Sequence, residues 1–228
     1  MKKAFTLAEV LITLGIIGVI AAMTIPTVIN SYKKQETLSR VKKVYSLLSQ
    51  AIQRTVMTDG WNIVPLKDSD NASIENWYQK MFGDNLKVVK YCLEEAGCWN
   101  SGTLFLDGTT PDNDRGSVGM GGNCLTFVTA DGYFILLDAW SGESISSRFG
   151  VNTAQDGLSI YVDINGDKKP NVIGKDVFVF TYTMERGLLP AGKDKAISTL
   201  MGNCPYGNGM WCLERIIRDG WSLDNINF

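Results

Sequence analysis

The chain has 228 residues, a formal net charge of −2 and no histidine. The lack of histidine excludes Ser-His-Asp and Cys-His nucleophilic sites and histidine-ligated zinc. The sequence also contains no P-loop, dinucleotide-binding glycine motif or nucleophile elbow. We therefore expect no enzyme activity and no cofactor, apart from a possible calcium ion discussed below. The charge gives no basic footprint for nucleic acid.

An apolar run from Phe5 to Ile29 follows a short basic leader. At about 1.5 Å per residue, a helix of this length covers about 37 Å, which is enough to cross a bilayer with some tilt. One carboxylate, Glu9, interrupts the run, and a lone acid in such a segment costs about 2.5 to 3.5 kcal/mol on insertion scales. We expect Glu9 to have a partner. The alternative is that it reaches the membrane edge alone.

The order of residues at the start differs from that of a secretory signal peptide, which places its small cleavage residue after the apolar run. Here Ala4 precedes the run, so cleavage there leaves the membrane segment attached. The motif Phe5-Thr6-Leu7-Ala8-Glu9, with the apolar run behind it, resembles the start of the type IV pilin and pseudopilin family. The chain departs from that pattern at Ala4, where the family usually has glycine, and at Ala8, where a larger apolar residue is usual.

The resemblance implies both processing and assembly. A prepilin peptidase is expected to cleave between Ala4 and Phe5 and to methylate the new Phe5 amine. Glu9 would then neutralise that amine on a neighbouring subunit. The family usually has a proline where this chain has Pro26, and the resemblance implies a helix kink there that takes part in filament packing. The alternative is that Pro26 simply ends the helix.

The resemblance also implies an organisation in four parts. Residues 1–4 form the leader, 5–29 the transmembrane and filament-core helix, 30–58 an amphipathic continuation, and 59–228 a globular domain. Lys2 and Lys3 are expected to hold the start in the cytoplasm, which places the domain outside a bacterial inner membrane. In a filament the apolar helices would pack through small residues, namely Gly15, Gly18, Ala21 and Ala22.

Beyond the membrane run, the spacing of apolar residues predicts the fold. From residue 31 to 58 one stripe steps by three and four, which is typical of an amphipathic helix, and Asp59-Gly60 ends it. The stripe comprises Leu38, Val41, Tyr45, Leu48 and Ile52. Later patterns predict a helix over 73–82 with Ser73 as N-cap, strands over 103–106, 125–129, 133–137, 158–164 and 177–183, and a helix over 210–218. The fold class is therefore α+β, with the long N-terminal helix packed against an antiparallel sheet.

Five cysteines suggest disulfides if the domain is exported to an oxidising compartment. Short-range closure favours Cys92–Cys98 and Cys204–Cys212, although sequence alone does not fix the pairing. Cys124 opens an apolar run and is expected to be a buried thiol. The alternatives are that all five are reduced, or that some bind zinc.

A polar loop places Asp163, Asn165 and Asp167 at alternate positions, as at the start of an EF-hand loop, and Asp176 could supply a later ligand. The match is partial, because Lys168 and Gly174 stand where an EF-hand has glycine and an acid. The alternative is a plain Asx-type turn between two strands, without metal.

Two functions follow from these observations. The first is a structural subunit of a type IV pilus or a type II secretion pseudopilus. Its partners would be itself, other pilins, the peptidase and an inner-membrane assembly platform. The second is a minor tip pilin that binds a substrate, a surface or DNA through tryptophans: Trp61, Trp77, Trp99, Trp140, Trp211 and Trp221.

Overall fold

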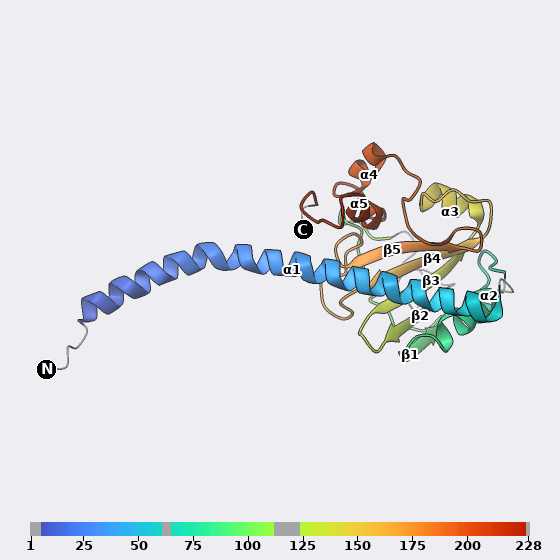
Figure 1. Ribbon diagram of the computed structural model, residues 1–228, viewed down its shortest axis with the longest axis horizontal. Helices are drawn as coiled ribbons and strands as arrows, with labels where there is room; N and C mark the ends of the chain where they lie inside the picture. Colours follow the sequence, from blue (N-terminus) through green and yellow to red (C-terminus); the bar gives the residue numbers. More distant parts are fainter. Residues whose placement is uncertain (1–5, 61–64, 112–123, 227–228) are drawn as a thin grey trace. The chain divides into compact units, whose positions relative to one another are not determined.

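The computed structural model describes residues 6–60, 65–111 and 124–226, except for the side chain of Asp59. The chain divides into two compact units, Met1–Ser39 and Arg40–Phe228. The elements, labelled in Figure 1, are α1 (Leu7–Asp59), α2 (Asn71–Tyr78), a π-helix (Gln79–Gly83), β1 (Val88–Leu93), β2 (Cys124–Thr129), β3 (Phe134–Trp140), α3 (Gly142–Arg148), β4 (Gly157–Asp163), β5 (Val177–Thr183), β6 (Gly187–Pro190), α4 (Ile197–Asn203) and α5 (Cys212–Arg218).

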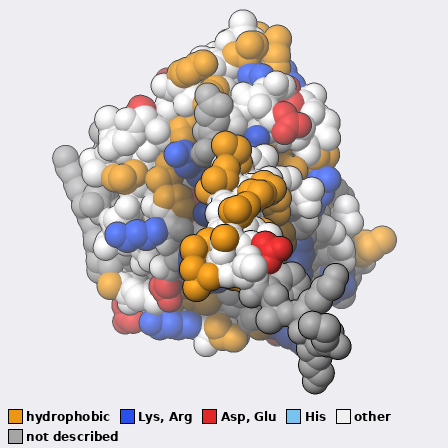
Figure 2. Space-filling model, turned by 90° about the vertical axis from the view of Figure 1, so that its left-hand side faces the viewer, with side chains coloured by type: hydrophobic (Ala, Val, Ile, Leu, Met, Phe, Trp, Pro, Cys, Tyr) orange, Lys and Arg blue, Asp and Glu red, His pale blue; other side chains and the backbone are white. Residues whose placement is uncertain are grey.

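The first unit is the apolar part of α1. Its large side chains are exposed in the single chain, from Leu7 at 80% to Ile29 at 46%. By length and composition alone, this helix could cross a membrane. Hydrophobic side chains gather in the centre of the view in Figure 2. The alternative that Pro26 ends the helix is wrong, because α1 continues without a break to Asp59.

In the second unit, the last third of α1 covers one face of the sheet. Val41, Leu48 and Ile52 of the predicted stripe are buried, and the Tyr45 ring lies 5.4 Å from that of Phe180 in β5. The helix ends at Asp59 and is followed by Gly60, whose φ of +66° suits glycine. The predicted fold class is confirmed: a long N-terminal helix packs against an antiparallel sheet.

The sheet has six strands in the order β1-β2-β3-β4-β5-β6, and every neighbouring pair is antiparallel. Each strand therefore pairs with the next one along the chain. The predicted hairpin over 125–137 is confirmed, with Phe127 opposite Ile135 and Gly132 in the turn at φ +80°. The strands predicted over 158–164 and 177–183 are β4 and β5.

Both faces of the sheet are covered. On the α1 side, Trp77 and Phe82 follow α1 and pack edge-on with ring centroids 5.0 Å apart. On the other side a second core includes Trp99, Ile145 of α3 and Met210. In Figure 1, α1 and α3 lie on opposite sides of the strands. The sheet is thus buried on both faces, which explains why β4 and β5 are buried at every position.

Three expected elements differ in detail. The helix expected from Ser73 starts at Asn71, because the Asp70 carboxylate caps it by accepting a bond from the Ala72 N–H. The strand expected over 103–106 is reduced to a single bridge between Leu104 and Val172.

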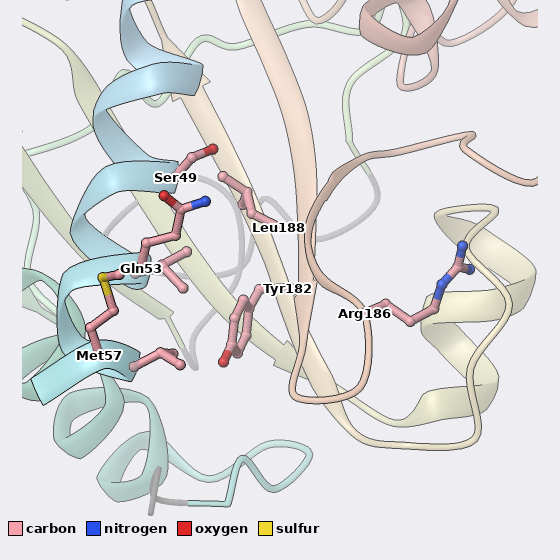
Figure 3. Close-up of a pocket in the computed structure, with 9 residues that line it drawn as sticks. Ser49, Gln53, Met57, Tyr182, Arg186 and Leu188 are labelled. Carbon is pink, nitrogen blue, oxygen red and sulfur yellow. The ribbon is translucent and has the colours of Figure 1, made fainter. Parts of the chain in front are cut away.

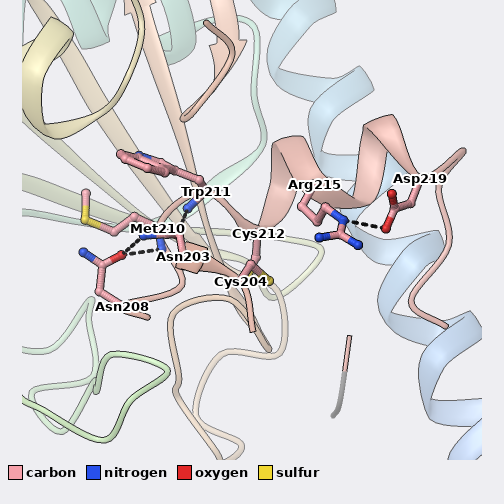
Figure 4. Close-up of a disulfide and its surroundings, with 8 residues drawn as sticks. All are labelled: Asn203, Cys204, Asn208, Met210, Trp211, Cys212, Arg215 and Asp219. Carbon is pink, nitrogen blue, oxygen red and sulfur yellow. Dashed lines mark hydrogen bonds and ion pairs between the residues drawn. A yellow bond between two sulfur atoms is a disulfide. The ribbon is translucent and has the colours of Figure 1, made fainter. Parts of the chain in front are cut away.

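The final helix starts at Cys212 rather than at residue 210. The N–H groups of the two preceding residues donate instead to the side chains of Asn208 and Asn203 (Figure 4). Four elements, β1, α3, β6 and α4, were not expected.

Candidate functional site: the first turn and apolar face of helix α1

The first turn of α1 forms a capping box. The backbone N–H and the hydroxyl of Thr6 both donate to Oε2 of Glu9, at 2.9 and 2.8 Å. The Glu9 N–H donates back to the Thr6 hydroxyl at 3.3 Å. Thr6 is thus the N-cap and Glu9 the third helical residue, the arrangement in which two unsatisfied N–H groups are bonded reciprocally.

This box gives Glu9 a partner within its own subunit, which the sequence reasoning missed. The signal was present, because a threonine followed three residues later by glutamate before an apolar run is the usual mark of a capping box. Both bonds use Oε2, so Oε1 takes no part in the box. The expected cleavage and methylation residues, Ala4 and Phe5, lie outside the described residues.

Two glycines of the apolar face, Gly15 and Gly18, lie in open space among the described residues. A Cβ added to Gly15 or Gly18 would meet nothing within 4 Å. Glycine in a helix interior costs about 1 kcal/mol relative to alanine. The subunit therefore carries this cost at two positions for which its own described structure supplies no steric reason.

Pro26 lies inside α1 and has no N–H to donate to the carbonyl one turn earlier. Two residues before Pro26, the Thr24 hydroxyl donates to the Ile20 carbonyl at 2.9 Å. Side-chain hydroxyl bonds of this kind are a normal way to hold a helix in an apolar setting. The helix thus passes through Pro26 with a local gap in its backbone bonding.

A shallow groove of about 400 Å³ lies between the last turns of α1 and the β5–β6 hairpin (Figure 3). Its walls include Ile52, Val56 and Leu188, and the Tyr182 hydroxyl is buried there with no hydrogen-bond partner among the described residues. The Arg186 side chain points away from the groove and pairs with Asp194. Among the lining residues that the structure describes, none pairs a nucleophile with a base.

The loop considered for calcium is closed by its own hydrogen bonds. Asp163 Oδ1 accepts the N–H groups of Asn165 and Gly166, and Oδ2 accepts from the Asn100 amide. Burial raises the pKa of Asp163 to about 7, although the N–H bonds oppose this rise.

Asp176 is bonded in the same way, because it accepts from the N–H groups of Asn171 and Val172 and from the Asn165 amide. Three of the four expected ligands, Asp163, Asn165 and Asp176, therefore lie together, while Asp167 is exposed. Within the described ranges, no group of three or more Asp, Glu, Cys or His residues is arranged to hold a metal.

Two disulfides, Cys92–Cys98 and Cys204–Cys212, join the pairs that short-range closure favoured. The second ties the start of α5 to the end of α4 (Figure 4). Cys124 lies in the core and takes part in neither disulfide, and burial raises the pKa of its thiol to about 12. A thiol of this kind is unreactive at neutral pH.

Comparisons with known proteins identify no relative: no family model, no curated protein and no solved structure matches the chain.

Proposed function

We propose that this chain is a structural subunit of a type IV pilus or a type II secretion pseudopilus. The supporting observation is the motif from Phe5 to Glu9 placed directly before a helix whose apolar side chains have no cover in the subunit. An apolar surface of this length must be buried in lipid or against other helices. In the proposal both occur in turn, first in the inner membrane and then in the filament core.

The glycines fit the same proposal. Gly15 and Gly18 leave gaps that none of the described residues fills, and small residues let neighbouring helices approach closely. Repeated head-to-tail addition through such contacts gives a helical fibre rather than a closed ring. The domain beyond Arg40 then forms the outside of the filament, and the 163–176 loop serves as a hydrogen-bonded turn within it.

Processing and localisation belong to the proposal as well. A prepilin peptidase removes residues 1–4 and methylates Phe5, and the domain lies outside the cytoplasm. Two disulfides are compatible with an oxidising compartment. An inner-membrane assembly platform then adds the processed subunit to the filament.

The tip-pilin alternative finds less support. Of its six tryptophans, Trp77 and Trp99 are buried, and Trp61 lies outside the described residues. The other three are partly buried, each with a cation over its ring from Arg148, Lys195 or Lys42. Side chains used in this way do not form an open recognition patch.

Mass spectrometry of the mature protein tests the proposal. We expect the chain to begin at Phe5 and to carry one added methyl group on its amine. A mature chain that still begins with Met1, or that lacks the apolar segment, would refute it. Copy number in sheared fibres then separates a major subunit, which is abundant, from a tip subunit, which is scarce.

A further inference from the structure

The groove beside α1 lies next to an edge of the sheet. The strand β6 is the last of the six strands, and within the described part of the chain it pairs with β5 alone. In Figure 3, Leu188 of β6 and Tyr182 of β5 lie across the groove from Ser49 and Gln53 of α1. All these residues belong to the second unit. The groove and the edge of β6 are therefore parts of one surface.

The register of β5 and β6 determines which backbone groups of β6 are free. The Ala191 N–H donates to the Val179 carbonyl at 3.0 Å, and bonded positions alternate along an antiparallel pair. Leu188 lies opposite Tyr182 at a non-bonded position, so its N–H and C=O point away from β5. Among the described residues, no other segment bonds the Leu188 backbone. The edge of β6 thus offers one donor and one acceptor to a further strand.

The side chain of a residue that pairs with Leu188 would enter the groove. Residues directly opposite one another on neighbouring strands point to the same side of a sheet. Leu188 points to the α1 side, because its partner Tyr182 packs on Trp77 with ring centroids 4.9 Å apart. The walls of the groove there include Ile52 and Val56. A strand added to β6 would therefore place a side chain against an aliphatic surface.

The Tyr182 hydroxyl requires an acceptor that the described residues do not supply. It belongs to the lining of the groove and is buried without a hydrogen-bond partner. Burial raises the pKa of Tyr182, and the nearby Trp77 N–H opposes that rise, but an indole N–H can only donate. A buried donor without an acceptor is unfavourable. A carbonyl oxygen brought into the groove would satisfy it.

The charge of the groove limits what it can hold. Among its described lining residues only Arg186 is charged, and its guanidinium points away in Figure 3 and pairs with Asp194. The polar groups of Ser49, Gln53 and Tyr182 are neutral. An uncharged aliphatic side chain is therefore complementary to the groove, whereas a charged one would lose water without gaining a counter-charge. The volume of about 400 Å³ falls within the range of about 300 to 1,000 Å³ for ligand pockets.

From these features we infer that β6 and the groove bind an extended, uncharged peptide segment of a partner protein by β-strand addition. The segment pairs with Leu188 through two backbone hydrogen bonds and packs an aliphatic side chain against Ile52 and Val56, while a peptide carbonyl accepts from the Tyr182 hydroxyl. Backbone bonds supply the affinity and the groove supplies the selectivity. Pro190 has no N–H and ends the available edge, so the segment is short. The inference concerns the second unit only and is independent of the proposed function.

The test titrates a synthetic peptide into the nitrogen-15-labelled full chain in phospholipid nanodiscs and follows the backbone amide resonances by NMR. The probe is a blocked five-residue peptide with leucine at its centre and threonine elsewhere. We expect saturable binding that shifts the Leu188 amide resonance. N-methylation of the central leucine removes the N–H that donates to the Leu188 carbonyl, and lysine in its place adds a charge. Each altered probe should bind at least about five-fold more weakly.

Variants of the chain provide a second, matched comparison. Val56→Lys adds a charge to the groove wall and should weaken binding at least about ten-fold, whereas Val89→Lys, on the opposite edge strand β1, should not. Tyr182→Phe removes the unsatisfied hydroxyl and should weaken binding a few-fold without lowering the melting temperature. Tyr91→Phe, which removes a hydroxyl that donates to Glu75 at 3.0 Å, should leave binding unchanged.

The outcomes are distinct. A Leu188 resonance that does not move overturns the inference, and so does equal binding of the parent and N-methylated probes. A Leu188 resonance that changes on dilution of the chain without peptide shows that a second copy occupies the edge, which also overturns it. Preference for the parent probe over both altered probes, lost in Val56→Lys and kept in Val89→Lys, supports the inference.

Discussion

Glu9 has two possible tasks, to cap its own helix and to neutralise an amine on a neighbouring subunit, and two substitutions separate them. Glu9→Gln keeps a side-chain oxygen that can accept from the Thr6 N–H, since glutamine also serves in a capping box, but it removes the charge. Thr6→Ala removes the hydroxyl bonds of the box and keeps the charge. Comparison of the two therefore shows which task assembly requires.

The expected magnitudes differ enough to be measured. Loss of an N-cap side chain costs about 1 kcal/mol, or about five-fold in an equilibrium constant. An ammonium left without its counter-charge in lipid costs about 3 kcal/mol, or more than 100-fold for each subunit contact. We therefore expect Thr6→Ala to reduce filament yield by a few-fold and Glu9→Gln to abolish filaments.

Filaments sheared from cells and quantified against the membrane pool of subunit provide the assay. The membrane pool and the extent of cleavage and methylation should be unchanged in both variants, which controls for insertion and processing. If Glu9→Gln assembles as well as wild type, or if Thr6→Ala is the more damaging change, charge pairing is not required and the carboxylate serves only as a cap.

Four further predictions concern the fold and the apolar face. Replacing Cys204 and Cys212 by serine opens a short loop and should lower the free energy of unfolding by about 2 to 3 kcal/mol in urea titrations of the full chain in detergent; an unchanged midpoint would contradict this. Gly18→Ile should leave the subunit's melting temperature unchanged and reduce filament yield at least about ten-fold, whereas Gly202→Ile, also in open space, should not affect yield. Burial raises the pKa of Asp138 to about 7 against the pull of Arg148, so the folded state keeps a proton that the unfolded state releases above about pH 4. Asp138 should therefore contribute a loss of stability on the order of 2 to 4 kcal/mol as pH rises from 4 to 7. Asp138→Asn should remove that share of the loss and leave the share of Asp163, whose pKa is also raised to about 7; an equal slope in both proteins would refute the assignment. Because the carboxylates of the 163–176 loop already accept N–H bonds, calcium and a chelator should give the same melting temperature, and a rise above about 5 °C in calcium would show a metal site.

Features that depend on neighbours in the sequence were predicted well. The stripe from Val41 to Ile52 marks the buried side of α1, because a helix repeats its faces every three to four residues. The hairpin around Gly132 was predicted because an Asp-Gly pair favours a tight turn. The cysteine pairing could be predicted because each pair closes a short loop.

Elements stabilised by distant contacts were missed. The edge strand β1 has a single fully buried position and includes Lys90, so no alternation of apolar residues marks it. The strand β6 has only four residues. The helix α3 has one buried apolar side chain, Ile145, and depends on the Ser141 cap, whose hydroxyl accepts from the Ser144 N–H. In each case the sheet or a cap stabilises a segment whose own pattern is weak.

The candidate site shows the same contrast. The motif that ends at Glu9 can be recognised from five consecutive residues. The capping box lies in the same residues and could have been predicted from them, although it was not. The arrangement of the side chains in the loop from Asp163 to Asp176 could not be predicted, because alternate positions share a face only while the chain stays extended. Gly166, at φ +64°, turns the chain, and Asp167 is exposed as a result.

The continuity of α1 from Leu7 to Asp59 has a consequence for proteolysis of this protein. Val44 and Leu48, which pack on the sheet, belong to the same helix as the exposed apolar segment. A protease that cut α1 anywhere between Arg40 and Asp59 would remove part of the helix that covers the sheet. The aromatic residues of the sheet would then be exposed to water. Proteolysis therefore leaves the sheet covered only where the cut falls before Arg40, the first residue of the second unit.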